Sequence, residues 1–216
     1  MLSLTTSKAG HPMTYHHGNL RIALLDRAAE VIAESGIEAL SLRALARDIG
    51  VSHAAPSRHF KDKADLLAAL AAEGQRRMID ALNEAAEAAG DDPVARYNAL
   101  GRECIRFSLM NRAYALAFEN PEVQRHSDKA LLEARAAYNR TVRQAAEAAQ
   151  QAGWHPGVDV DVLQLFSTAA ATGAASMLIH DEQYQGMPLE EAERLAAQII
   201  NLVIPPSSNA LRSNRK

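Results

Sequence analysis

The apolar residues of this chain recur at the spacing of amphipathic α-helices, and the alternation typical of β-strands is scarce. Residues 20–35 place their leucine, valine and isoleucine side chains on one stripe, which predicts a helix with Asn19 as its N-cap. In residues 41–49 the apolar side chains fall at positions i, i+3, i+4 and i+7, which predicts a second helix capped by Ser41. The pattern therefore favours an all-α protein.

Turn and capping residues divide the rest of the chain into further helices. Asp92-Pro93 and Asn120-Pro121 each place an N-cap residue before a proline at the first helical position, which is a favourable helix start. Glycines and the Pro205-Pro206 pair mark helix ends. The expected segments are a very short helix over 52–59 and longer helices over 62–90, 92–110, 120–152, 159–180 and 189–204.

The composition agrees with a protein that buries a helical core. Of 216 residues, 48% are hydrophobic, 23% are charged and only 5% are aromatic. No run of about 18 apolar residues is present, so no membrane span is expected, and residues 1–17 lack the apolar stretch of a secretory signal. The single cysteine, Cys104, lies on an apolar helical face, where a buried small hydrophobe is expected and a redox role is the alternative. We expect a cytoplasmic protein.

The net charge of −3 is unevenly distributed along the chain. Residues 1–77 hold 10 basic and 8 acidic side chains, together with five of the eight histidines. Residues 78–204 hold 10 basic and 18 acidic side chains. A mildly basic N-terminal third on an acidic body suggests that one end of the molecule meets an anion such as nucleic acid.

Residues 41–60, SLRALARDIGVSHAAPSRHF, have the pattern of a helix-turn-helix. A capped amphipathic helix meets a glycine turn, and the short helix expected over 52–59 follows. This short helix contains no large apolar residue, and Val51 and Phe60 can anchor its two ends. Its small and hydrogen-bonding side chains suit close approach to a phosphate backbone or a base edge. Pro56 is expected in its first turn, facing the two preceding helices.

Residues 15–75 resemble the DNA-binding domain of the TetR family of bacterial transcription regulators. The matching pieces are the pattern of the first helix, SLRALARDIGVS, the His59-Phe60 pair and the stretch DKADLLAAL. The resemblance implies an N-terminal helix-turn-helix domain and a helical C-terminal domain for ligand binding and dimerisation. The corresponding divisions of this chain are an N-terminal arm (1–17), a DNA-binding domain (18–64), an effector-binding and dimerisation domain (65–204) and a tail (205–216).

The same resemblance implies which residues contact DNA. The residues at the matching positions are Ser41, Arg43, Ser52, His53, Ala54, Ser57, Arg58, His59 and Lys63. The three residues that open the short helix would face the major groove. His59 and Lys63 would contact phosphates, Lys63 together with the dipole of the helix that follows. Ser57 stands where the family usually has a phosphate-contacting tyrosine, and its side chain reaches less far.

The large side chains of the C-terminal half are core residues by default, and the resemblance implies that some of them line an effector pocket between helices. The candidates are Phe107, Met110, Tyr114, Phe118, Tyr138 and Met177. No charged residue stands out among the buried positions, so the expected effector is a small apolar or aromatic molecule. Small residues at 169–176 and the apolar stripe of 189–204 are implied to pair with a second copy in a homodimer.

The implied function is a ligand-responsive DNA-binding regulator, a repressor that leaves its double-stranded operator when the effector binds. No catalytic spacing and no Gly-rich phosphate loop appears, so neither an enzyme nor a cofactor is expected. The adjacent His16 and His17 lack the spacing of a preformed metal site, and no metal is expected. The alternative is a helical small-molecule-binding protein that has lost specific DNA binding, which the departure at Ser57 favours.

Overall fold

The computed structural model describes residues 20–125 and 128–205, and this part of the chain is helical without strands. The α-helices are α1 (Leu20–Ser35), α2 (Leu42–Asp48), α3 (Lys63–Ala88), α4 (Pro93–Met110), α5 (Arg112–Glu119), α6 (Pro121–Arg125), α7 (Lys129–Gln151), α8 (Val160–His180) and α9 (Leu189–Val203). Three 3-10 turns join them, η1 (Ile37–Ala39), η2 (Pro56–Arg58) and η3 (Glu182–Tyr184). The expected arm, the Asn19 cap and all of the expected tail but Pro205 lie outside the described residues.

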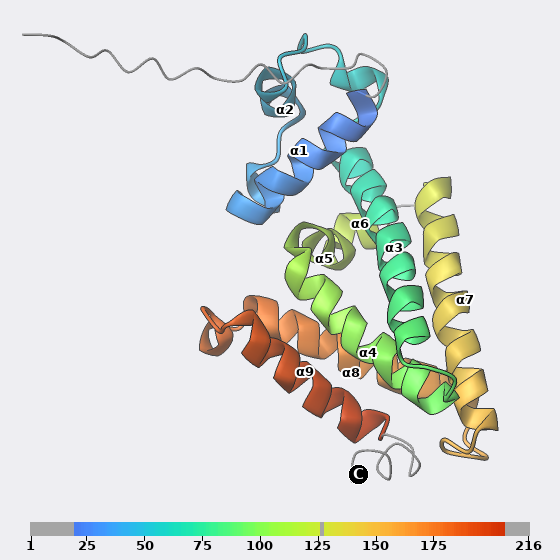
Figure 1. Cartoon of the computed structure of the whole chain (residues 1–216). Helices are drawn as coiled ribbons and strands as arrows, with labels where there is room; N and C mark the ends of the chain where they lie inside the picture. The colour runs from blue at the N-terminus through green and yellow to red at the C-terminus, as the bar shows by residue number, and fades with distance from the viewer. Residues whose placement is uncertain (1–19, 126–127, 206–216) are drawn as a thin grey trace, which may run out of the picture.

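The helices form a small headpiece on a larger body (Figure 1). The headpiece consists of α1, α2, η2 and the start of α3. From there α3 runs into the body and lies along α7, while α4 crosses beneath it and α8 and α9 lie at the far end (Figure 1). One cluster of buried apolar residues extends from Leu24 in α1 to Ile204 after α9, so a single core joins headpiece and body.

Local capping signals place most helix starts where the sequence predicts them. Asp62 caps α3 by accepting a hydrogen bond from the backbone N–H of Asp65 at 2.9 Å. Asp92 caps α4 by accepting from Val94 N–H at 2.9 Å, with Pro93 at the first helical position. The expected helices over 159–180 and 189–204 are confirmed as α8 and α9. Ser41 occupies the N-cap position of α2, but its side chain makes no capping hydrogen bond.

The short helix expected over 52–59 is wrong as an α-helix. The chain makes a turn in which Ala55 N–H donates to Ser52 C=O at 2.9 Å, and the 3-10 turn η2 follows. Pro56 explains the difference, because it has no N–H to donate to Ser52 C=O and so cannot close an α-helical turn there. Pro56 is itself buried and packs against α1 and α2, as predicted.

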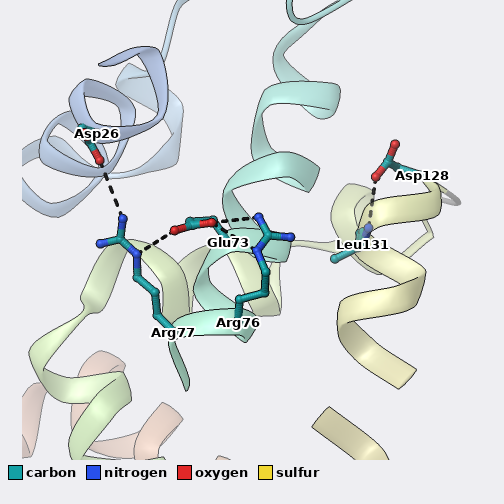
Figure 2. Close-up of polar contacts among 6 residues, drawn as sticks. All are labelled: Asp26, Glu73, Arg76, Arg77, Asp128 and Leu131. Atoms are coloured by element: carbon teal, nitrogen blue, oxygen red, sulfur yellow. Dashed lines mark hydrogen bonds and ion pairs between the residues drawn. The ribbon is translucent and has the colours of Figure 1, made fainter. Parts of the chain in front are cut away.

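The expected helix over 120–152 is two helices. Asn120 accepts from Glu122 N–H at 2.9 Å and starts the short α6. A second start follows at Asp128, whose carboxylate accepts from Leu131 N–H at 3.0 Å and caps α7 (Figure 2). The sequence pattern also gave no separate signal for α5, which begins after Asn111, where non-helical backbone angles end α4.

By length and composition alone, α8 could cross a membrane. It is the one such helix in the part of the chain that the structure describes. A core helix of a globular protein meets the same criterion, and α8 packs against α4, α7 and α9. It therefore carries no argument for a membrane.

Candidate nucleic-acid interface

An ion pair fixes α2 against α1. The guanidinium of Arg27 in α1 donates to Asp48 at the end of α2 from Nε at 3.2 Å and from Nη2 at 3.1 Å, and Nη1 binds Glu30 at 2.8 Å. Both bonds to Asp48 reach the same carboxylate oxygen, Oδ2, and they are charge-assisted on both sides. The orientation of α2 is thus set from its C-terminal end, and its N-terminal end faces outward.

The turn after α2 and the segment that follows are anchored from below. Gly50 has a positive φ of 73°, and Val51 N–H donates to Ala46 C=O at 2.9 Å, which closes the helix end as glycine allows. At the other end Phe60 is 1% exposed, and its N–H donates to Pro56 C=O at 2.9 Å. Between these anchors Pro56 is buried and Ala55 is partly buried, whereas the other side chains are exposed.

Eight of the nine residues predicted to contact DNA are exposed. They are Ser41, Arg43, Ser52, His53, Ala54, Ser57, Arg58 and His59. Within the described part of the chain neither Arg43 nor Arg58 is paired with a carboxylate, so both charges are available to an external anion. The side chain of Lys63 is 35% exposed, and its Nζ lies 3.8 Å from Oε2 of the fully exposed Glu38. Such an exposed ion pair is weak and can exchange for a phosphate.

The sequence predicts that Lys63 acts together with the dipole of α3, and the N-terminus of this helix does not support that prediction. Asp62 accepts from the N–H of Asp65, and Asp65 accepts from the N–H of Lys61 at 2.9 Å. Two carboxylates therefore already occupy the positive end of the helix dipole. Lys63 offers its own charge at this point, without further help from the dipole.

Two cations at this end of the molecule were missed from the sequence. Lys61 is exposed beside the matched motif, and its position next to Lys63 was an available signal. Arg21 lies on α1 with its guanidinium carbon 5.4 Å from the centre of the Phe60 ring. The sequence gave no signal for this contact, because it joins two elements that are far apart along the chain.

Arg77 connects the headpiece to the body (Figure 2). Its Nε donates to Glu73 on the same helix at 2.9 Å, and its Nη2 lies 4.0 Å from Asp26 of α1. Its guanidinium carbon also lies 5.5 Å from the centre of the Tyr114 ring of α5. Burial alone would raise the pKa of Glu73, but hydrogen bonds from Arg76 and Arg77 bring it below its usual value. The helices α1, α3 and α5 thus meet at one guanidinium.

A close backbone approach holds Tyr114 in place. A Cβ added at Gly74 of α3 would lie 2.7 Å from Cγ of Tyr114, so only glycine fits there. On its other side the Tyr114 ring stacks on Phe107, with ring centres 6.2 Å apart and an interplanar angle of 15°. Both aromatic residues are 6% exposed.

The six residues predicted to line an effector pocket do not share one site. Phe107 and Tyr114 pack in the core as described above, and Phe118 is partly buried. Met110, 53% exposed, borders an open groove of about 670 Å³ beside η3, and Met177 is 51% exposed on α8.

Tyr138 alone of the six borders an internal cavity of about 20 Å³, together with Tyr97, Cys104 and Ser167. Cys104 is buried, as expected. The contact that brings Tyr97 to Ser167 joins positions 70 residues apart, which sequence spacing could not reveal.

Comparison with known proteins identifies the class of this fold. The family described as "Bacterial regulatory proteins, tetR family" matches residues 24–70. A protein of unknown function from Rhodococcus sp. RHA1 is 34% identical, with a TM-score of 0.70, over 90% of this chain and 100% of that chain. The chain belongs to the tetR family of bacterial regulatory proteins.

Two more distant structures share the fold. The FadR regulator of Bacillus subtilis, solved with stearoyl-CoA, is 17% identical with a TM-score of 0.69, over 85% of this chain and 97% of that one. AibR, solved with isovaleryl coenzyme A and operator DNA, is 19% identical with a TM-score of 0.66, over 87% and 99%. No curated protein matches the sequence.

Replacing Arg77 by methionine should loosen the junction between α1 and α3. Arg77→Met removes the contacts to Asp26 and Tyr114, and we expect the free energy of unfolding to fall by about 1 kcal/mol at pH 7. Chemical denaturation measures this value, and hydrogen exchange should rise in α1.

Arg76→Met is the matched control, because Arg76 also binds Glu73 but is not paired with Asp26. It should cost only roughly 0.3 kcal/mol. The loss in Arg77→Met should shrink as the pH falls through the lowered pKa of Glu73, because its carboxylate is then protonated in the folded protein. Equal effects of the two substitutions at pH 7 would remove the special role of Arg77.

Proposed function

We propose that this protein is a homodimeric regulator that binds operator DNA through its headpiece and releases it when a small apolar or aromatic molecule binds in the body. The observation that carries the proposal is the set of exposed cations, Arg43 and Arg58 among them without a carboxylate partner in the described residues, and of small polar side chains at 41–63, on a headpiece of the tetR family. Cations on α2, η2 and α3 would bind phosphates, and 52–54 would approach base edges. The division into 18–64 and 65–204 follows from this assignment.

The far end of the body offers the surface for a second copy. On α8, Val162, Leu165 and Phe166 are 56%, 72% and 55% exposed, and Leu202 on α9 is 87% exposed. Apolar residues so exposed on adjoining helices are typical of an interface. A two-fold dimer through α8 and α9 would present two headpieces to half-sites about 34–36 Å apart.

Release by an effector requires that the ligand bind more tightly to the form that does not fit DNA. AibR and FadR, which share the fold, were solved with acyl-coenzyme A ligands, which supports a ligand site in the body of this chain too. The helix α5 lies between that body and the headpiece. Arg112 at its start donates to Ile179 C=O of α8 at 3.3 Å, and Glu119 at its end lies 2.7 Å from Nε2 of His180. A shift of α8 would thus move α5 through these two contacts, and Tyr114 of α5 would then move against Arg77.

A binding protein without specific DNA recognition is the second candidate. Ser57 favours it, because the side chain of a serine reaches less far than that of the tyrosine usual at this position of the family. In either case we expect a cytoplasmic protein without catalytic activity, as the regulatory family suggests.

Fluorescence anisotropy with the DNA that flanks the protein's own gene tests the proposal. We expect nanomolar binding, tighter than binding to random DNA by about a thousandfold. If all fragments selected from the whole genome bind no better than random DNA, the protein is no specific regulator and the second candidate stands.

Lys63→Ala should weaken binding to every DNA sequence alike. Loss of one phosphate contact should reduce the slope of log K against log salt by about one unit. Lys129→Ala is the control, because Lys129 is 89% exposed on α7 and is not among the residues predicted to contact DNA. An unchanged slope in Lys63→Ala would show that Lys63 does not contact phosphate.

Leu165→Glu should dissociate the dimer, because it places a carboxylate opposite an apolar surface or its own copy. Sedimentation should show monomers at concentrations where the unmodified protein is dimeric. Leu132→Glu changes a leucine that is 48% exposed on α7 and should leave the dimer intact. Dimers of unchanged stability in Leu165→Glu would place the interface elsewhere.

A further inference from the structure

Arg21 is an exposed cation in the first turn of α1, and its charge is available to an external anion. Within the described residues its side chain forms no ion pair with a carboxylate, and residues 1–19, 126–127 and 206–216 contain neither aspartate nor glutamate. The first turn of α1 also holds no acidic residue, in contrast to α3, where Asp62 and Asp65 already occupy the positive end of the helix dipole. The charge of Arg21 and the dipole of α1 therefore favour an anion at the same place.

The ring of Phe60 holds this cation in position. The guanidinium carbon of Arg21 lies 5.4 Å from the centre of the ring, which is within the range of a cation–π contact. Phe60 is 1% exposed, and its N–H donates to Pro56 C=O at 2.9 Å, so the ring itself is fixed. A guanidinium that already lies on a fixed ring loses less conformational freedom on binding than one that is free in solvent.

The same contact brings Arg21 to the segment that is predicted to bind DNA. The helix α1 packs against η2, and its first residues lie beside η2 in Figure 1. The ring of His59, which is predicted to contact phosphate, lies 6.5 Å from the Phe60 ring. Lys63, the other predicted phosphate contact, follows Phe60 by three residues. Hydrogen-bond donors from three parts of the headpiece thus lie around one buried ring.

The segment between the anchors has little positive charge of its own. Arg58 is the one lysine or arginine in residues 52–59. Neutralisation of phosphates by lysine and arginine supplies much of the affinity of proteins for DNA. An ordered cation on a neighbouring helix therefore makes a measurable difference to binding by this headpiece.

We propose that Arg21 binds a phosphate of the DNA backbone and that Phe60 is the residue that positions it. The inference rests on the proposed function and adds α1 to the elements that bind phosphate. The planar guanidinium can donate two N–H groups to one phosphate while its face stays on the Phe60 ring. A contact to phosphate reads no base, so it strengthens binding to every sequence alike.

Salt-dependent DNA binding by the full-length protein tests this inference. Anisotropy is measured with a random-sequence duplex and with the fragment that flanks the protein's own gene, each at several salt concentrations. Arg21→Met removes the charge and keeps an unbranched side chain that can still pack on Phe60. It should weaken binding to both DNAs about fivefold and reduce the slope of log K against log salt by about one unit. Arg21→Lys keeps the charge, so it should keep the slope and weaken binding only about twofold.

Arg47→Met is the matched control. It removes the same charge from the headpiece, but Arg47 is 74% exposed at the end of α2, lies 3.7 Å from Asp48 and is not among the residues predicted to contact DNA. It should leave the slope unchanged. Phe60→Leu keeps an apolar anchor and removes the aromatic face. It should weaken binding about twofold in the unmodified protein and have no further effect in Arg21→Met.

An unchanged slope in Arg21→Met overturns the inference. An equal loss of slope in Arg47→Met also overturns it, because the effect is then one of net charge. Independent effects of Phe60→Leu and Arg21→Met would remove the positioning role of Phe60.

The two DNAs separate this failure from that of the proposed function. Specific binding that persists with an unchanged slope in Arg21→Met keeps the regulator and removes the Arg21 contact. A protein that binds both DNAs alike but loses slope in Arg21→Met keeps the contact and removes the specific regulator. A protein that binds neither DNA overturns both.

Discussion

The burial of α3 on all sides near its start, over residues 66–72, is the constraint on which the rest of this structure depends. Seven consecutive residues, 66–72, are buried, although an amphipathic helix would bury only one face. Such a helix must be covered all round, here by α1 of the headpiece and by α5 and α7 of the body. Since 26 residues of helix extend about 39 Å, α3 reaches from the headpiece deep into the body without a hinge. Headpiece and body consequently share one core, and displacement of one end of α3 is felt at the other.

The two ends of the molecule separate two kinds of chemistry. In the headpiece cations are exposed and available to phosphates, whereas the polar groups around the internal cavity are neutral and already desolvated. The junction between the headpiece and the body combines an ion pair with a buried aromatic ring. The side chain of Arg77 is 50% exposed and pairs with Asp26, yet its guanidinium lies over the buried ring of Tyr114. Movement of Tyr114 by a ligand in the body would therefore change an ion pair on α1 without any contact between ligand and headpiece.

Signals that are local in sequence predicted this fold well, and contacts between distant segments were not predictable. The all-α class and the starts at Asp62, Asp92 and Asp159 followed from capping chemistry within three residues. Pro56 lies within the motif and is expected in the first turn of a short helix, but its missing N–H prevents an α-helical turn there, and the expected α-helix is wrong. The exposure of the predicted DNA-contacting residues could likewise be predicted from the sequence, because a segment without large apolar side chains gains little free energy from burial.

The packing contacts of the body could not be predicted as well. Helical spacing tells which residues share one face of a helix, but it does not tell which element packs against that face. Met110 and Met177 follow the same periodicity as core residues yet lie half-exposed, since none of the helices in residues 20–125 and 128–205 covers them. Conversely, Ser167 lies within an apolar helix, and only the approach of Tyr97 from α4 gives it a role.

The anchored segment at 52–58, in which a turn and the 3-10 turn η2 take the place of an α-helix, changes what DNA binding would depend on. One turn of chain offers few side chains to base edges, so in the proposed complex cations on separate elements would supply much of the affinity, namely Arg21 on α1, Arg43 on α2 and Lys63 on α3. Contacts spread in this way engage the phosphates together only while α1, α2 and α3 keep their relative positions. Phosphate binding then depends on the Arg27–Asp48 pair and on the burial of Phe60, neither of which would touch DNA. A small rotation of α1 against α3 would misplace several cations at once, which makes the junction at Arg77 an effective place for a signal from the body to act.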